Sequence, residues 1–519
     1  MRTARFIGSW LAGLLALTLA VVLFVQWIRF ALDSAGTGDT PAPLFLWMAF
    51  GVNLLVWSFV GLLRLGDESI QTLARRRARA VASGHTTEDR ALGAVAERGR
   101  SLVRVRSSAQ DGDGGDDVGN TTAVAVRTES DTADPAPPRT AAEPMALAVI
   151  IPAHNEEPVI DGAIRSALRL FNRWDIYVVS DSSNDATADI AAETGVNVLE
   201  LLSNRGKAGA IEAVIAEFDL IENYDGVVIL DADTELDENY VEGARRQFGD
   251  PTVAAVAGFV VAEWKPKERT VVGRLISAYR DRLYWLLQYL IRFGQTWRFT
   301  SATFIVPGFA SAYRTSVLKH IDINPRGLVI EDFNMTFEVH HKSLGRISMR
   351  PDTKAYCQDP FTLGDYVSQV RRWTLGFWQT VRRHGVWPSL FWFALFFYIL
   401  EVVLVAVTLL TTVALGVFTL LPMLTDDAVL AFGWYESGYA AVTAVLPLTV
   451  IAVGLFVPDY VLTCVMAMVR RRPGYLVYGL FFLPVRVIDA YLTLRTIPQA
   501  WTAKSDGRWK SPERSAQTL

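Results

Sequence analysis

The sequence predicts an α/β domain, built on a parallel sheet with helices on both faces, set between groups of membrane-spanning helices. Two observations predict this arrangement. Long apolar runs lie on both sides of the middle of the chain, and hydrophobic residues make up 51% of its 519 residues. Between those runs, short β-branched stretches alternate with helical patterns, and this alternation is typical of a parallel sheet.

Composition excludes few function classes. The formal net charge of −4 says little by itself, because basic and acidic residues are segregated along the chain. The two cysteines, Cys357 and Cys464, exclude a disulfide framework and a cysteine-rich zinc site, so both are interpreted as free thiols. We expect no nucleic-acid partner.

Residues 1–70 are predicted to hold two membrane-spanning helices. The apolar run Phe6–Ile28 is long enough to span a bilayer. A signal peptide is the alternative, but the length of this run and the second run at Leu44–Leu63 favour a retained helix. The loop between the runs has Arg29 as its only basic residue, whereas arginines follow the second run. The positive-inside rule therefore places the N-terminus and the residues after Leu63 in the cytosol.

Residues 71–144 are predicted to form a disordered linker. The stretch lacks hydrophobic periodicity and contains the runs DGDGGDD and DPAPP. We expect a tether, with a regulatory role as the alternative.

Residues 145–368 are predicted to form the α/β domain. Four segments, ALAVIIPAHNEE, DIYVVSDSSNDAT, VNVLELLSNRGKAG and GVVILDADTELD, each join a short β-branched run to a polar loop. Ligands of parallel sheets bind beyond the carboxyl ends of the strands. The polar residues of all four segments fall at those ends.

The C-terminal part of the chain is predicted to return to the membrane. Spans are expected near Leu395–Leu421 and Ala440–Val469, and no Lys or Arg occurs between His384 and Val469. Basic residues stand at both ends of this stretch, which predicts an in–out–in hairpin.

A last apolar segment, roughly Tyr475–Leu494, is ambiguous because it contains Pro484, Arg486 and Asp489. It spans the membrane, re-enters it or lies along the interface, so region 389–496 is predicted to hold two to three helices. The basic tail, 497–519, favours a cytosolic C-terminus, which a further full span would not allow.

Two of the polar loops suit a nucleotide. Asp181 offers a carboxylate to a base or ribose, although Asp, Ser and Asn also suit helix N-caps. Lys207 follows a glycine at a predicted helix start, where it can meet phosphate together with free backbone N–H groups. The spacing is not that of a P-loop.

A third loop suits a metal. Asp231 and Asp233 leave a hydrophobic strand two residues apart, so both lie on one face of an extended chain. Two such carboxylates suit a hard divalent cation that also holds a diphosphate. The alternative is a solvated acidic loop, but bare charge directly after a buried strand is costly.

Two further segments suit group transfer. Glu331 and Asp332 open a helix, where acidic residues are favourable in any case, and either could serve as a general base for an attacking hydroxyl. In QVRRWTLGFWQTVRRHG, Arg372 can neutralise a departing diphosphate and Trp373 can stack on a sugar ring. The same segment also suits an interfacial anchor, with Arg382 and Arg383 on lipid.

Together these residues fit transfer of a sugar from a nucleotide diphosphate. Over roughly Val149–Trp373 they resemble the processive, membrane-integrated family 2 inverting glycosyltransferases, which include cellulose, hyaluronan, chitin and poly-N-acetylglucosamine synthases. The resemblance implies a cytosolic GT-A (Rossmann-like) domain beside an α-helical transmembrane region, a UDP-sugar donor, and Mg²⁺ or Mn²⁺.

The resemblance also implies a role for each matching residue. Asp332, in IED, would be the catalytic base, and Asp233, in LDADT, the metal ligand. The residues implied to bind the nucleotide sugar are Pro152, Asn155, Glu156, Asp181, Lys207, Asp231 and Arg372. Those implied to contact the acceptor are Glu331, Gln369 and Trp373. The QxxRW motif, which marks processive synthases, opens the predicted interfacial helix at 369–388.

Two departures leave the donor sugar open. Ser180-Asp181 stands where the family has paired aspartates, and PGFASAYR, Pro307–Arg314, matches no single subfamily. The expected function is extension of a β-linked polysaccharide at the plasma membrane, in the lipid bilayer, with an accessory export subunit as a candidate partner.

Three alternatives remain. One is non-processive transfer of sugar to a membrane lipid, and another is a non-catalytic nucleotide-sugar receptor or scaffold. A transporter built on the helices alone is disfavoured, because the spans are few and no internal repeat is visible.

Overall fold

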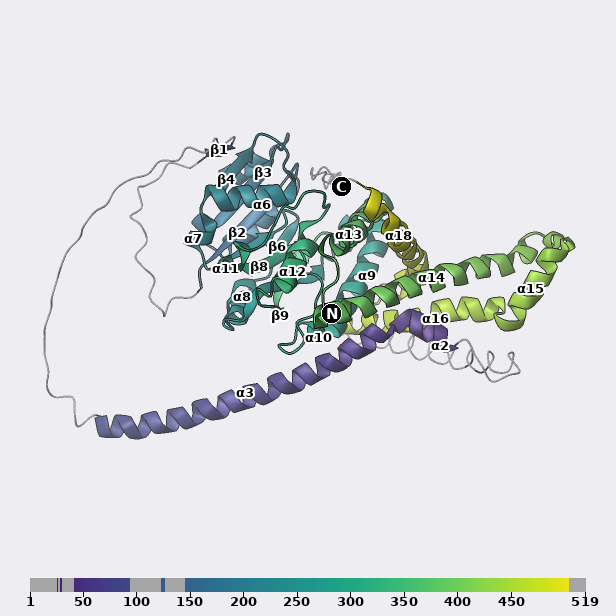
Figure 1. The fold of residues 1–519 in the computed structure, drawn as a ribbon, viewed down its shortest axis with the longest axis horizontal. Helices are drawn as coiled ribbons and strands as arrows, with labels where there is room; N and C mark the ends of the chain where they lie inside the picture. Colours follow the sequence, from purple (N-terminus) through teal and green to yellow (C-terminus); the bar gives the residue numbers. More distant parts are fainter. Residues whose placement is uncertain (1–25, 27–28, 30–41, 94–122, 127–144, 504–519) are drawn as a thin grey trace.

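The computed structural model describes residues 26, 29, 42–93, 123–126 and 145–503. The first predicted span, Phe6–Ile28, therefore lies almost wholly outside the described residues, as do most of the predicted linker and of the basic tail. Figure 1 shows a sheet domain at one end of the molecule and long helices extending from the other.

Within the described residues the sheet has nine strands. In spatial order they are β1 (Ala123–Val126), β4 (Asn197–Leu201), β3 (Ile176–Asp181), β2 (Leu147–Ala153), β5 (Gly226–Leu230), β8 (Ala310–Arg314), β7 (Val253–Ala262), β9 (Arg346–Cys357) and β6 (Thr234–Leu236). Strands β4, β3, β2 and β5 are parallel, as predicted. Strand β8 is antiparallel to β5 and begins a mixed half that the sequence did not predict.

Helices cover both faces of the sheet. On one face lies α6 (Gly206–Glu217), and on the other lie α4 (Ile160–Leu168), α5 (Thr187–Glu193) and α8 (Tyr240–Phe248). Successive residues of β2 point to opposite faces, so Val149 joins one hydrophobic core and Ile150 the other. A strand buried on both faces reads as a continuous apolar run, which explains the sequence LAVII.

The order in which the chain adds parallel strands to the sheet reverses between β2 and β5. From β2 the chain proceeds to β3 and β4 on one side, and then returns to place β5 on the other side. The carboxyl ends of β2 and β5 therefore form a topological switch point, where loops diverge and leave a crevice for a ligand. The remaining short helical elements of this domain are η1 (Arg173–Asp175), α7 (Leu220–Asn223), η2 (Pro266–Glu268) and α11 (Thr315–Leu318).

The helices between the sheet domain and the apolar region are α9 (Val271–Leu286), α10 (Phe293–Gln295), α12 (Glu331–His341) and α13 (Leu363–His384), with a π-helical turn, η3 (Leu287–Arg292), between α9 and α10. Arg64, from the N-terminal helix α3 (Val52–Gly93), binds this junction. Its guanidinium donates to the carbonyls of Phe293, at 2.7 Å, and Met349, at 3.2 Å. The N-terminal helix is thereby fixed to the sheet domain.

Helix α3 corrects one boundary of the sequence analysis. The linker was expected from residue 71, but α3 continues to Gly93, and β1 forms within the same stretch. The segment QTLARRRARAVA is rich in strong helix formers, which extend a helix without needing an apolar face. Periodicity alone could not show this.

Three helical segments among the described residues are long and apolar enough to cross a membrane: α14 (Leu390–Leu424), α16 (Leu448–Val469) and Tyr475–Thr502, which comprises α17 (Tyr475–Tyr478), η5 (Gly479–Phe481) and α18 (Phe482–Thr502). Segment Pro43–Phe50 with Val52–Ala74, bent by 59°, is a fourth if the pair is one span. The ambiguous last segment thus has the length and composition of a span.

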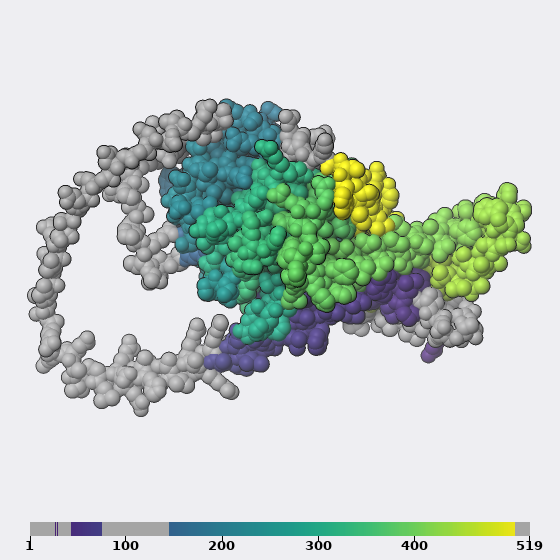
Figure 2. Space-filling model, in the orientation of Figure 1, coloured from purple at the N-terminus to yellow at the C-terminus, as the bar shows by residue number. Residues whose placement is uncertain are grey.

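The predicted span Ala440–Val469 is divided in the structure. Helix α15 (Gly433–Val445) ends before Pro447, and α16 begins at Leu448. Together with η4 (Ala428–Ala431), α15 closes the end of an arm in which α14 and α16 lie side by side (Figures 1 and 2). This arm projects from the rest of the molecule, as Figure 2 shows.

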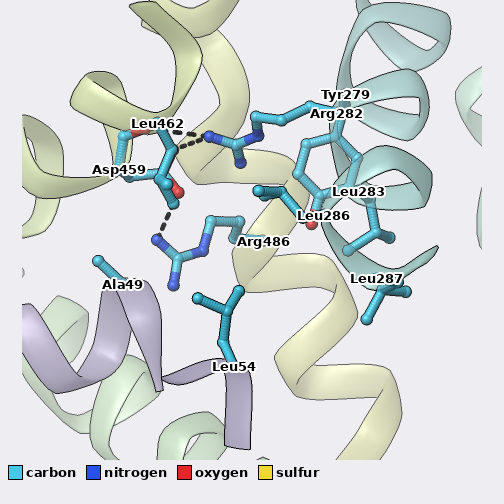
Figure 3. A pocket seen from close by; sticks show the side chains of 10 residues that line it. All are labelled: Ala49, Leu54, Tyr279, Arg282, Leu283, Leu286, Leu287, Asp459, Leu462 and Arg486. Atoms are coloured by element: carbon cyan, nitrogen blue, oxygen red, sulfur yellow. Dashed lines mark hydrogen bonds and ion pairs between the residues drawn. The ribbon is translucent and has the colours of Figure 1, made fainter. Parts of the chain in front are cut away.

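Three charged side chains inside the apolar region form a buried triad, namely Asp459, Arg282 and Arg486. Asp459 of α16 accepts from Arg282 of α9 at 2.8 Å and from Arg486 of α18 at 2.9 Å (Figure 3). Arg486 also donates to the carbonyl of Met48, at the bend before α3. These groups line a cavity of about 180 Å³ whose other walls are mostly leucine. The triad of Asp459, Arg282 and Arg486 therefore joins α9, α16 and α18 to one another and to α2 (Ala42–Phe50).

Replacing Asp459 with asparagine is expected to lower the free energy of unfolding by about 3–5 kcal/mol, because two buried guanidinium groups would lose their shared carboxylate. Thermal melting of the purified protein in nanodiscs measures this. Asp426→Asn, on an exposed loop, is the control and should change stability by less than about 0.5 kcal/mol. Equal melting temperatures for the two variants would contradict the proposed role of the triad.

Candidate active site

The loops after β2 and β3 form one unit at the switch point. The side-chain oxygen of Asn155 accepts from the backbone N–H of Asn184 at 2.8 Å. The backbone N–H of Asn155 donates to the hydroxyl of Ser183 at 3.1 Å. Asn155 has a φ of 54°, a left-handed conformation that asparagine tolerates better than most residues. Pro152 lies in β2 opposite Val179 of β3. Glu156 is buried, and its backbone N–H donates to the hydroxyl of Thr187. These predicted residues shape the loops.

Asp181 lies buried beneath the start of α6. Its two carboxylate oxygens accept from the backbone N–H groups of Arg205 and Gly206, at 2.7 and 2.8 Å. Burial raises the pKa of Asp181, and these two hydrogen bonds oppose the rise. Asp181 thus satisfies N–H groups at a helix start, although the helix is not the one that follows it in sequence. A contact of Asp181 with a nucleotide base stays a prediction.

Lys207 is the centre of the site. Its ammonium lies 2.6 Å from Oδ1 of Asp231 and 2.9 Å from Oε1 of Glu331, and it donates to the carbonyl of Gly308 at 3.1 Å. Burial alone lowers the pKa of Lys207, but the two carboxylates outweigh it and raise the pKa above its ordinary value. The lysine that the sequence assigned to phosphate therefore joins the start of α6 and the end of β5 to the start of α12.

Asp332 lies next to this cluster, in the first turn of α12. Its carboxylate accepts from the backbone N–H groups of Gly308, at 3.3 Å, and Phe333, at 2.7 Å. Burial and then the charge of Glu331 raise the pKa of Asp332 to about 7. A carboxylate with a pKa near neutral pH is suited to take a proton from a hydroxyl.

Gly308 is required by this packing. A Cβ at this position would lie 2.9 Å from the ammonium of Lys207 and 3.2 Å from Oε1 of Glu331. The sequence analysis noted the surrounding PGFASAYR segment but did not place this glycine against the lysine and the acids. Only the folded loop shows that a side chain would displace them.

Asp231 and Asp233 fit a divalent cation that a substrate helps to hold. Burial raises the pKa of Asp231, while Lys207 lowers it. Within the described residues no three His, Cys, Asp or Glu side chains converge as a ready-made metal site. Cations such as Mg²⁺ commonly bind one or two carboxylates and complete their coordination with substrate phosphates and water. The two aspartates suit that arrangement, and they do not suit a site built by protein alone.

Helix α13 brings the QVRRW segment to the same site. Gly376 packs against Ile330, directly before Glu331, and the side chain of Gln379 accepts from the N–H of Val329 at 3.1 Å. Burial raises the pKa of Glu331, and the charge of Lys207 lowers it below its ordinary value. The exposed Arg372 is close enough to lower this pKa further, by a smaller effect. The structure therefore brings Arg372 and the acids at the start of α12 together.

The other two residues of the motif lie along the same helix. Trp373 is half-buried, and Oε1 of Gln369 is buried without a hydrogen-bond partner in the part of the chain that the structure describes. Arg382 and Arg383 each make a contact within the protein, and their predicted contact with lipid stays a prediction. Arg382 donates to the carbonyl of Ala500 at 2.7 Å, and Arg383 pairs with Asp322 at 2.8 Å, as expected of side chains that fasten α13 to its neighbours.

Sequence reasoning missed two further side chains. His154 lies 2.6 Å from the backbone oxygen of Asp181 through Nδ1. It stands within the segment IIPAHNE, so its position beside the strand end was a usable signal. Arg280 of α9 lies over the ring of Trp373, with 4.6 Å between its Cζ and the ring centre. No sequence signal links α9 to α13.

A half-parallel sheet with a lysine, paired aspartates and a helix-borne acid at its switch point defines a GT-A glycosyltransferase domain. Residues 148–322 match the family model for Glycosyl transferase family 2. The match extends from β2 through the end of α11 and includes Asp181, Lys207, Asp231 and Asp233.

The chain is also similar in sequence to curated glycosyltransferases. The chain is 25% identical over 236 residues to a poly-beta-1,6-N-acetyl-D-glucosamine synthase of Staphylococcus aureus, and 28% identical over 244 residues to a probable glycosyltransferase of Bacillus subtilis. Each alignment covers 44% of this chain and 54% of the relative, so the chain spans about half the length of these relatives. A mannosyltransferase from Pyrobaculum calidifontis, solved with GDP-Man and Mn²⁺, is 20% identical, with a TM-score of 0.40 over 60% of this chain and 88% of that one.

Proposed function

We propose that the protein is an inverting, processive glycosyltransferase that transfers sugar from a UDP-sugar to a growing β-linked polysaccharide. The observation that carries the proposal is the convergence of Asp332, with its raised pKa, on the cluster of Lys207, Asp231 and Glu331. The site lies at the switch point of a family 2 domain. We further propose that residues 145–368 are the catalytic domain, facing the cytosol beside the plasma membrane.

The reaction proposed is a single displacement at the anomeric carbon of the donor. The acceptor hydroxyl oxygen forms the new bond to that carbon, its proton passes to the carboxylate of Asp332, and the bond to the diphosphate breaks with its electron pair on the leaving UDP. Attack from the face opposite the diphosphate inverts the configuration. Lys207 keeps Asp231 and Glu331 in place beside Asp332.

A divalent cation supports this scheme. Mg²⁺ or Mn²⁺ held by Asp231 and Asp233 would supply positive charge to the departing diphosphate. Arg372, exposed near Glu331, supplies a second positive charge from α13. Both charges favour the transition state more than the ground state, because negative charge grows on the diphosphate as the bond breaks.

Two observations support a polymer as product. Helix α13, which carries Gln369, Arg372 and Trp373, packs through Gly376 and Gln379 against the segment that leads into Asp332, so an acceptor chain could bind next to the base. The relative from Staphylococcus aureus is named for the synthesis of a polysaccharide of N-acetylglucosamine. UDP-N-acetylglucosamine is therefore the first donor to test.

The test is UDP release by the purified full chain in nanodiscs, across a panel of UDP-sugars, with products sized on a gel. Release with one donor and a high-molecular-weight product is expected. A small, lipid-soluble product would replace the proposal with glycosylation of a membrane lipid. Nucleotide binding without release from any donor would replace it with a receptor.

Chelation of divalent cations is expected to abolish UDP release, because the charge on the leaving diphosphate would lose its main counter-charge. Release is measured before and after EDTA, and then after Mg²⁺ or Mn²⁺ is restored. The control is Asp233→Asn, which should resemble the chelated enzyme even with metal present. Full activity in EDTA would contradict the metal role of the two aspartates.

A further inference from the structure

We propose that Arg280 and Asp359 form a positioning pair that fixes the ring of Trp373 for the acceptor sugar. This inference rests on the proposed function. It assigns a role to two residues that lie outside the QVRRW segment and outside the cluster around Lys207. Neither residue would touch the reacting atoms, so both would act through Trp373.

Arg280 is a buried cation surrounded by aromatic rings. It lies in the middle of α9 with 3% of its surface exposed. Its Cζ is 4.6 Å from the ring centre of Trp373, 5.2 Å from that of Tyr366 and 5.9 Å from that of Tyr284. A guanidinium within about 6 Å of an aromatic face is attracted to it, and the attraction is strongest for tryptophan and in a desolvated site. Trp373 is therefore its principal ring contact.

Asp359 holds Arg280 by charge rather than by hydrogen bonds. The closest approach between the two side chains is 3.6 Å, from Nη1 of Arg280 to Oδ1 of Asp359, and the side chain of Asp359 is fully buried. Among the described residues, no hydrogen bond of good geometry reaches either carboxylate oxygen of Asp359 or Nη2 of Arg280, although the hydroxyl of Ser277 is close enough to offset part of the rise that burial gives the pKa of Asp359. Buried ion pairs usually complete their hydrogen bonds. Here the orientation of the guanidinium is set mainly by its contacts with the aromatic rings.

The loop that carries Asp359 is itself fixed. Arg269, also buried, donates to the backbone carbonyl of Asp359 at 2.9 Å, and its guanidinium lies 4.6 Å from the ring centre of Phe361. The carboxylate is therefore held at a set position after β9. If Arg280 moved away, the buried carboxylate would lose the larger of the two positive charges that act on it, with Arg269 supplying the smaller, and this loss is costly.

The orientation of the Trp373 ring thus depends on its contact with the guanidinium of Arg280, and the orientation of that guanidinium depends on the ring. Trp373 is half-buried, so part of the ring remains accessible while the rest contacts Arg280. Loss of Arg280 would free the ring to rotate. That change would weaken acceptor binding, whereas the nucleotide end of the site, around Asp181, is built from other elements.

The experiment compares Arg280→Met and Arg280→Lys with the wild type, using an oligosaccharide of the sugar that the donor panel identifies as acceptor. Arg280→Met is expected to raise the acceptor KM about tenfold, the size of a desolvated cation–π contact. The KM for the UDP-sugar and the Kd for UDP should change less than twofold. Arg280→Lys keeps the cation and should recover most of the loss. Arg274→Met, on the same helix, is the control and should leave every constant unchanged.

The double variant Arg280→Met/Asp359→Asn removes both charges and keeps the test valid if Arg280→Met does not fold. A raised acceptor KM in the double variant supports the proposal. An acceptor KM restored to that of the wild type would overturn it, because Arg280 would then only balance the charge of Asp359. Turnover by the wild type tests the proposed function separately, and an unchanged acceptor KM in an active Arg280→Met enzyme overturns the positioning role alone.

Discussion

Replacing Asp332 with asparagine is expected to lower sugar transfer about 10³-fold, the contribution of a well-placed general base. The amide of asparagine cannot take the proton of the acceptor hydroxyl. Its single amide oxygen can keep the 2.7 Å hydrogen bond from the N–H of Phe333, whereas the longer bond from Gly308, made to the other carboxylate oxygen, is lost. UDP release measures the loss, and calorimetry should show unchanged UDP binding.

Asp219→Asn is the matched control, since Asp219 is exposed in a left-handed conformation that asparagine also adopts readily. It should retain the activity of the wild type. If Asp332→Asn keeps more than about a tenth of that activity, another group must accept the proton, and Glu331 would be the next candidate.

The same carboxylate sets the expected pH dependence. Burial and the charge of Glu331 raise the pKa of Asp332 to about 7, and a general base works only when it is deprotonated. The value of kcat/KM should therefore be constant above pH 7 and fall about tenfold per pH unit well below it. A rate that is flat between pH 5 and 8 would contradict this assignment.

Much of the fold followed from local patterns in the sequence. The strands β2, β3, β4 and β5 are buried on both faces, so their apolar runs and the polar loops after them are visible without a structure. Strand β8 runs antiparallel to β5 and β7, whereas β7 and β9 pair in parallel, so this half of the sheet is mixed. Their pairing depends on contacts between distant segments, which no local pattern reports.

The candidate site was predictable as a set of residue types but not as a set of contacts. The sequence identified Lys207, Asp231, Glu331 and Asp332, and the structure brings them together. Nothing in the spacing indicated that Lys207 pairs with two acids, because they come from β5 and α12. Arg280 was missed for the same reason. Its aromatic partner lies on another helix, and only the fold makes them neighbours.

Replacing Lys207 with methionine separates two roles that the sequence and the structure assign to it. The structure indicates that Lys207 organises the acids, since its charge also lowers the pKa of Asp332 against the effects of burial and Glu331. Without that charge the pKa of Asp332 should rise, and the acidic limb of the pH–rate profile should move about one unit toward higher pH. At pH 7 that shift alone should lower the rate about fivefold.

Lys207→Arg keeps the charge and is the control, so its acidic limb should stay near that of the wild type. The sequence alone assigned Lys207 to the phosphates of the donor, and that role predicts a different outcome. Loss of a phosphate contact would raise the KM for the UDP-sugar and leave the acidic limb unmoved. Because the limb reports the base and KM the donor, a shifted limb with an unchanged KM would assign Lys207 to the acids. A raised KM with an unmoved limb would overturn the organising role and return Lys207 to the diphosphate.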